Sequence, residues 1–372
     1  MSNITLYGSS LSLYTGRARS YLIKAGLSYR ETVPVSQHYF EQVLPKMGGR
    51  RSVPVIETET GEVIRDGAAI IDHYEEKSGQ RFSPSTPKQK TLSLLFDVIG
   101  AEGLLRPAMH YRWNFPEENL EFLIFHFQCY IPPHMDKREM AEKQMDRMRN
   151  AGENFGAVPA TFELVESLYC TLIEKLDRHF DQYPYLFGGK PSIGDFGMIA
   201  PLFAHLGRDP KSIRLMQTKA IRLFRWVERM NRPEPDIGEF DRKEENYLPE
   251  DEIPDTLIEV LQHIAIDFVP ETAAAAETIN AWLEQNKEMA TNTTAERQVG
   301  IASFEVTGTT VKAIAQPYRF YLLSRMQNHV DSLAEEDRKG VIELLQACCM
   351  SELMQMRLSR NIGRDDNREV WL

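Results

Sequence analysis

The first eighty residues alternate between short extended runs and helical runs, and this order constrains the fold more than any other feature. Ile4–Tyr7 is a strand-like run, and the helical run from Arg17 stops at Gly26, a typical helix-ending residue. A second extended run and a second helix follow. The stretch "SVPVIETETGEVIRD" then has the form of a hairpin, and "DGAAIIDHYEEKSG" spaces its apolar residues for one buried helix face. The predicted order is β-α-β-α-β-β-α.

That order is typical of a thioredoxin-like α/β domain, which we expect over residues 1–82. Residues 88–232 have helical periodicity almost throughout, so an all-helical domain is expected there. The polar, proline-rich and acidic stretch "RPEPDIGEFDRKEENYLPEDEIPD" predicts a boundary after it. Residues 233–372, called the C-terminal extension below, are predicted to be mainly helical with one β-hairpin around Thr307-Gly308.

Charge and composition exclude several classes of partner. The chain has 372 residues, with 43 Lys and Arg against 54 Asp and Glu, which gives a net charge of −11. A nucleic acid or an anionic membrane is therefore not expected as a partner, because both require cationic surfaces. No apolar run is long enough to span a membrane, and the four cysteines have no C-x-x-C spacing. We expect a reduced, cytoplasmic protein without a metal site.

Three motifs occur in a familiar order: "SVPVI", "GEVIRDGAAIIDHYEE" and "PYLFGGKPSIGDFGMIAPL". Together with the predicted domains they make the chain resemble the cytosolic glutathione transferases over roughly residues 4–230. The resemblance implies reduced glutathione as co-substrate, a small hydrophobic electrophile as second substrate, and a homodimer. The extension departs from the usual plan of this family. It has three possible roles: covering the cleft, enlarging a dimer contact or binding a partner.

The resemblance also implies a glutathione site in the N-terminal domain. The Val53-Pro54 bond would be cis, so that the backbone of Val53 pairs with the cysteinyl part of glutathione; the alternative is an ordinary trans proline. Asp66-Gly67 stands where the family has an acidic residue or Gln followed by Ser. Gly67 keeps the N–H but lacks the hydroxyl, which would cost roughly 1.5–3 kcal/mol of binding free energy. The other interpretation is that Gly67 is simply a tolerated N-cap. Arg51 is placed to neutralise a glutathione carboxylate.

The stretch "LYGSSLSLYTGR" offers several hydroxyls that could hold the thiolate. Ser12 falls on the first serine of the Ser-Ser-Cys motif of zeta-class relatives and is the first candidate donor, with Tyr14 second and Ser9 and Ser10 as further alternatives. Lowering a thiol pKa by about two units requires about 2.7 kcal/mol, which one charge-assisted hydrogen bond can supply. The competing interpretation is a polar turn in which Thr15 caps the following helix.

Two further motifs belong to the helical domain. His110, Tyr111 and Trp113 occur where the family lines its electrophile pocket, although such aromatic residues are equally typical of a domain-interface core. Ser192 and Asp195 form a predicted capping box with a structural role. The predicted function is a glutathione transferase that activates the glutathione thiolate through a hydroxyl. The alternative is a non-catalytic protein of the same fold that binds a protein partner or a hydrophobic ligand.

Overall fold

The computed structural model describes residues 4–132, 134–233, 238–240 and 244–372. Its N-terminal part is a four-stranded sheet of order β2-β1-β3-β4, in which β1 runs parallel to β2 and antiparallel to β3. The elements are β1 (Ile4–Tyr7), α1 (Leu13–Lys24), β2 (Tyr29–Thr32), the π-helical turn η1 (Tyr39–Val43), the 3-10 turn η2 (Leu44–Lys46), β3 (Val55–Glu57), β4 (Val63–Arg65) and α2 (Gly67–Ser78). The predicted thioredoxin-like α/β fold is confirmed.

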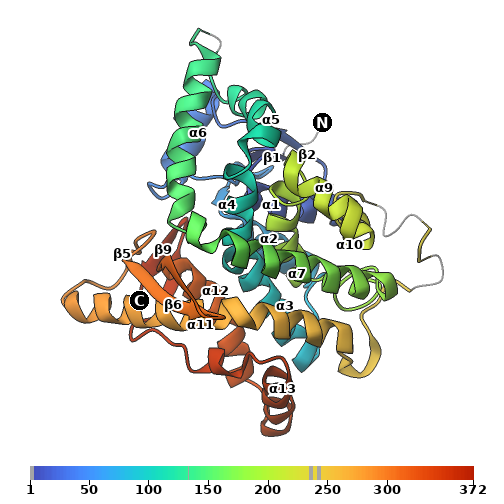
Figure 1. The fold of residues 1–372 in the computed structure, drawn as a ribbon. Coiled ribbons are helices and arrows are strands. Elements are labelled where there is room, and N and C mark those ends of the chain that lie inside the picture. Colours follow the sequence, from blue (N-terminus) through green and yellow to red (C-terminus); the bar gives the residue numbers. More distant parts are fainter. Residues whose placement is uncertain (1–3, 133, 234–237, 241–243) are drawn as a thin grey trace.

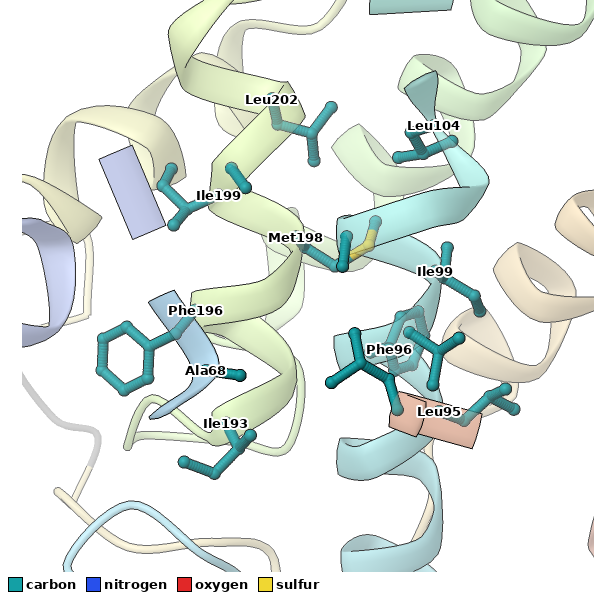
Figure 2. Packing of buried hydrophobic residues seen from close by; sticks show 14 of the residues in the cluster. Ala68, Leu95, Phe96, Ile99, Leu104, Ile193, Phe196, Met198, Ile199 and Leu202 are labelled. Atoms are coloured by element: carbon teal, nitrogen blue, oxygen red, sulfur yellow. The ribbon is translucent and has the colours of Figure 1, made fainter. Parts of the chain in front are cut away.

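The middle of the chain is helical, as predicted. Its elements are α3 (Pro87–Val98), the π-helical turn η3 (Ile99–Gly103), α4 (Leu105–Trp113), α5 (Pro116–Gln128), α6 (Lys137–Glu153), the 3-10 turn η4 (Pro159–Thr161), α7 (Phe162–Gln182), α8 (Ile193–Ala204), α9 (Pro210–Lys219) and α10 (Ile221–Met230). Helix α8 is almost wholly buried and packs against α1 on one side and α3 with η3 on the other. Figure 2 shows Phe96, Ile99 and Met198 meeting between α3, η3 and α8.

Two glycines allow the backbones of η3 and α8 to touch. A Cβ atom on Gly100 would lie 2.1 Å from the carbonyl carbon of Gly197, and a Cβ atom on Gly197 would lie 2.5 Å from Cα of Asp97. Any larger residue at either position would push the two helices apart. This close approach fixes the position of the π-helical turn.

The C-terminal extension is folded and mainly helical, but it contains more β-structure than predicted. Its elements are the 3-10 turn η5 (Pro249–Asp251), α11 (Asp255–Gln285), β5 (Thr293–Thr294), β6 (Ile301–Val306), β7 (Thr309–Ile314), α12 (Pro317–Asp331), α13 (Glu335–Ala347), the 3-10 turn η6 (Ser351–Met354), β8 (Ile362–Asp365) and β9 (Arg368–Trp371). The β6–β7 hairpin was predicted. The β8–β9 hairpin, which β5 joins as an edge strand, was not, so the expectation of a single hairpin is wrong. None of the described helices is long and apolar enough to cross a membrane.

Several elements of the extension pack against the helical part of the chain (Figure 1). Helix α11 lies against α7, and α12 and α13 lie against α3. One hydrophobic cluster runs without a break from Leu6 in β1 through Phe196 in α8 to Trp371 in β9. The domain boundaries expected near residues 88 and 233 therefore stay predictions, because the buried core does not separate there.

The β8–β9 hairpin ties the end of the chain to the outer edge of the N-terminal sheet. Asn367, in its turn, accepts a hydrogen bond from the Arg65 backbone N–H at 2.7 Å and donates to the Val63 carbonyl at 2.8 Å. The buried carboxylate of Glu369 pairs with Arg65 at 2.7 Å, Arg50 at 2.9 Å and Arg364 at 3.1 Å. These contacts provide hydrogen-bond partners for backbone groups on the outer edge of β4, which would otherwise be unpaired.

We expect Ser192→Ala to lower the free energy of unfolding by about 1 kcal/mol. Ser192 Oγ accepts from the Asp195 N–H at 3.4 Å, and Asp195 accepts in return from the Ser192 N–H at 2.8 Å. Urea unfolding checks the stability. Ligand affinity is expected to stay unchanged, since neither residue lines the cavity described below; weaker binding by a variant that folds normally would contradict the structural role.

Glu369→Ala is expected to lower the free energy of unfolding by about 3–5 kcal/mol, because it leaves three arginines together without their counter-charge. The matched control is Glu343→Ala, which removes an exposed glutamate 3.9 Å from Lys339 on α13 and should cost less than about 0.5 kcal/mol. Urea unfolding of both variants measures the difference. Equal, small effects would show that the C-terminal hairpin contributes nothing to the stability of the N-terminal sheet.

Candidate active site

A cavity of about 640 Å³ lies where the N-terminal domain, helices α4 to α6 and the extension meet. Its volume is within the range of about 300–1,000 Å³ usual for small-molecule sites. The wall is mostly apolar, and its apolar members include Leu11, Leu105, Met109, Trp113, Phe127 and Ile314. The extension contributes to the wall through the loop before β6, the start of α12 and the β8–β9 hairpin. Of the three roles considered for it, the structure shows that it covers the cleft.

The structure brings several of the predicted site residues together at this cavity. Ser9, Ser12, Tyr14, Val53, Asp66 and Trp113 line it. Pro54 and Gly67 are buried next to lining residues, and Arg51 is exposed outside the wall. The neighbouring Arg50 lines the cavity in its place.

His110 and Tyr111 lie outside the cavity wall, contrary to the predicted electrophile pocket. His110 is fully buried; its Nε2 lies 3.1 Å from Glu166, and burial lowers its pKa. The Tyr111 ring stacks on Phe115 at a centroid distance of 5.5 Å. For these two residues the alternative prediction of core packing fits the structure, whereas Trp113 one turn later reaches the wall.

Ser12 is the N-cap of α1. Its hydroxyl oxygen accepts a hydrogen bond from the Thr15 N–H at 3.3 Å, so the expectation that Thr15 is the cap is wrong. Thr15 is fully buried instead. Because an accepting hydroxyl keeps its own proton, Ser12 can still donate to a group in the cavity. The positive end of the α1 dipole lies at the same place.

The Tyr14 hydroxyl already has acceptors. It lies 3.3 Å from the Ala101 carbonyl and 3.4 Å from Oε1 of Glu102 in η3. Burial, together with the nearby Glu102 and Asp66 carboxylates, raises the pKa of Tyr14 well above its ordinary value. Tyr14 therefore stays protonated and directs its proton towards η3.

The Val53-Pro54 bond is cis, as predicted. The Pro54 carbonyl accepts from the Asp66 N–H at 3.0 Å, which holds the start of α2 against the proline. Asp66 is the N-cap of α2, with its carboxylate accepting from the N–H groups of Ala68 at 2.8 Å and Ala69 at 3.3 Å. The interpretation of Gly67 as the N-cap is thus wrong; Gly67 is the first residue of the helix.

There is little room for a side chain at position 67. A Cβ atom on Gly67 would lie 3.2 Å from the Tyr14 carbonyl oxygen and 3.4 Å from Cδ of Arg17. Arg17 is itself buried in an ion pair with Asp97. On the other side, the hydroxyl of Tyr318 in α12 donates to the Asp66 carboxylate at 3.0 Å. The extension therefore contacts Asp66, a residue predicted to bind the γ-glutamyl group.

Charged residues outside the sequence prediction shape the rest of the cavity. Arg112 donates to the Leu11 carbonyl at 2.8 Å and pairs with Asp209 at 2.6 Å, which holds the loop between β1 and α1 in place. Glu102 is 2% exposed, its Oε2 has no hydrogen-bond partner among the described residues, and burial raises its pKa to about 7. Arg112 lies within the run His110–Trp113, where the resemblance implied a pocket for the electrophile, whereas Glu102 gives no signal in the sequence beyond being a charged residue within a helical run.

No group of histidine, cysteine, aspartate and glutamate residues with the geometry of a metal site occurs in the described part of the chain. The polar groups of the cavity include hydroxyls, carboxylates, amides and guanidinium groups, and the N-termini of α1, α2 and α12 lie at its wall. This donor set is suited to binding an organic molecule that carries carboxylates, amides or a thiol.

Comparison with known protein families identifies the N-terminal domain. Residues 6–82 match the family model described as "Glutathione S-transferase, N-terminal domain". A search of curated proteins by sequence finds no match. Among solved structures, a glutathione transferase from Phanerochaete chrysosporium is 16% identical with a TM-score of 0.43, and the match covers 62% of this chain and 97% of the other.

Two further structures have similar values. The β-etherase LigF from Sphingobium sp. strain SYK-6 is 16% identical with a TM-score of 0.41, covering 64% of this chain and 99% of its own. A theta-class glutathione S-transferase from Xanthomonas axonopodis pv. citri, with glutathione bound, is 16% identical with a TM-score of 0.35, covering 62% of this chain and 92% of its own. Residues 6–82 are a glutathione S-transferase N-terminal domain.

Proposed function

We propose that the protein binds reduced glutathione in the cavity and transfers it to a small hydrophobic electrophile. The observation that supports this proposal is the meeting of Ser12, Val53 and Asp66 in one cavity wall. The family resemblance assigns these positions to the thiol, the cysteinyl backbone and the γ-glutamyl group. Their arrangement would allow one extended tripeptide to contact all three.

In this proposal the Ser12 hydroxyl donates a hydrogen bond to the thiolate. Ser12 is held as the cap of α1, so its hydroxyl is fixed relative to the helix N-terminus. The hydrogen bond and the helix dipole both favour the negative sulfur over the neutral thiol. A shift of the thiol pKa by about two units requires about 2.7 kcal/mol, within the range of one charge-assisted bond.

The backbone of Val53 and the N-terminus of α2 would hold the rest of glutathione. Val53 precedes a cis proline, and no hydrogen bond joins its backbone to another described residue. Since Gly67 supplies no hydroxyl, we expect affinity about ten- to a hundredfold below that of a site that has one. The electrophile would lie beyond the sulfur, against the apolar wall formed by Leu105, Met109 and Trp113.

A non-catalytic protein that binds a hydrophobic ligand is the second candidate function. The observation favouring it is that Asp66 already accepts from Ala68, Ala69 and Tyr318. All three hydrogen bonds end on Oδ1, so a ligand amine could use only Oδ2 without competing with them. The apolar wall would then bind a hydrophobic molecule without glutathione.

A thermal-shift titration with reduced glutathione up to about 10 mM separates the two functions. A dissociation constant near 0.1 mM would add about 2.7 kcal/mol of stability, enough to raise the midpoint by a few degrees. The shift should be lost in Val53→Pro, which removes the N–H that the cysteinyl group would use, and retained in the surface variant Glu343→Ala. No shift in the wild type would favour the non-catalytic function.

Ser12→Ala is expected to lower turnover of a model electrophile about ten- to a hundredfold, because the thiolate loses its donor. Since this change also removes a helix cap worth about 1 kcal/mol, Ser12→Asp is the second variant: it keeps the cap but cannot donate. Ser10→Ala, which lies outside the cavity wall, is the control. If turnover by both Ser12 variants stays within about twofold of the wild type, another residue is the donor.

A homodimer and a cytoplasmic location remain expectations from the sequence. Light scattering at micromolar concentration tests the first. A monomer would show that this chain does not use the pairing implied by its family.

A further inference from the structure

Glu102 combines features that set it apart from the other carboxylates of the molecule. It lies in the π-helical turn η3, lines the cavity, and is almost completely buried. Most buried carboxylates nearby are neutralised by arginine: Asp97 by Arg17, and Glu271 by Arg106 and Arg319. The Glu102 side chain has no such ion pair among the described residues. Its side-chain contact is the Tyr14 hydroxyl at 3.4 Å, and its Oε2 has no hydrogen-bond partner. A π-helical turn is a frequent location for functional residues.

The groups that face Glu102 come from every element packed around it. Tyr14 lies on α1, Asp66 at the start of α2, Glu271 on α11 and Arg319 on α12. Burial is the largest influence on Glu102 and raises its pKa to about 7; Glu271 and Asp66 raise it further, while Arg319 and the Tyr14 hydrogen bond oppose them. A carboxyl group of this kind can both take up and release a proton near neutral pH.

We propose that Glu102 is the acceptor of the proton that the glutathione thiol loses, received through the Tyr14 hydroxyl. The proposal rests on the function proposed above. The S–H proton moves to the Tyr14 oxygen while the Tyr14 proton moves to Oε1 of Glu102. The sulfur keeps the electron pair of the S–H bond. The result is a thiolate, a neutral Tyr14 and a protonated Glu102, which keeps the proton while the thiolate is bound and releases it to water after the thiolate has reacted.

This role complements that of Ser12. The Ser12 hydroxyl can stabilise a thiolate but cannot take up its proton, because it has no base beside it. Tyr14 and Ser12 lie on the same cavity wall, two residues apart at the start of α1. The Tyr14 proton is directed at η3, where Oε1 of Glu102 and the Ala101 carbonyl both lie within reach, so the oxygen lone pairs of Tyr14 are available to the thiol. In this proposal Glu102 does not contact the thiol itself. It acts through Tyr14, and we therefore call it a positioning residue for the proton.

The test compares the wild type with Glu102→Gln, which keeps the size of the side chain but cannot accept the proton. The thiolate formed by bound glutathione is measured by its ultraviolet absorbance. The protons released to the solvent are measured by calorimetry in buffers of different ionisation enthalpy. S-methylglutathione, which has no thiol proton, reports binding alone. Tyr14→Phe breaks the link while leaving Glu102 in place, and Glu166→Gln, outside the cavity, is the matched control.

In the wild type near pH 7, about half of the Glu102 side chains are ionised and can take up a proton. The number of protons released to the solvent should therefore be about half a proton lower, per thiolate formed, than without this uptake. Glu102→Gln and Tyr14→Phe should each lower the thiolate fraction about tenfold, with affinity for S-methylglutathione unchanged. Glu166→Gln should match the wild type. Unchanged thiolate and proton release in a folded Glu102→Gln variant would overturn the relay alone. If neither glutathione nor its S-methyl derivative binds the wild type, the relay and the proposed function are both wrong.

A second measurement tests the state of Glu102 without any ligand. The folded protein holds the Glu102 proton with a pKa of about 7, whereas the unfolded chain releases it near 4.5. Wild-type stability relative to Glu102→Gln should therefore decrease as pH rises from about 5 to about 8. Thermal midpoints of the two proteins across this range measure the effect. If the thermal midpoints of the two proteins change with pH in parallel, the proposal is overturned, because Glu102 would then be ionised over the whole pH range.

Discussion

The contact between Gly100 and Gly197 is the constraint on which the rest of the site depends. It lets the backbones of η3 and α8 meet without intervening side chains, and α8 in turn packs against α1 of the N-terminal domain. Because protein interiors are close-packed, a change in the distance between η3 and α8 would displace every element that packs against them. The π-helical turn that carries Glu102 and helix α1, which Ser12 caps and which contains Tyr14, are thus both held in position by α8.

Local features of the sequence predicted the local features of the structure. The alternation of runs up to Ser78 predicted the sheet and its helices, and the Ser192–Asp195 spacing predicted the capping box. Such signals depend on neighbours within a few residues, which a sequence displays directly. The cap of α1 was assigned to Thr15 instead of Ser12, an error of less than one turn, because both hydroxyls satisfy the same local rule.

The parts that could not be predicted depend on contacts between distant segments. Tyr318 reaches Asp66 across 252 positions of the chain, and Asn367 reaches Arg65 across 302. Nothing near Glu102 in the sequence indicates that its carboxylate is buried, because "IGAEGLL" also fits an exposed glutamate on a helix. Its surroundings come from four separate elements, and one sequence does not specify how they meet.

The β8–β9 hairpin determines at what stage of synthesis the cavity can form. Ile362 and Glu369 form part of the cavity wall, yet they are synthesised after every other lining residue. Since chains emerge from the ribosome N-terminus first, the thioredoxin-like domain is present long before its cavity can close. Until then the apolar wall and the edge of β4 face solvent. Synthesis of the β8–β9 hairpin therefore determines when the cavity can close, and a product that ends before this hairpin would carry Ser12, Val53 and Asp66 without the enclosed cavity around them.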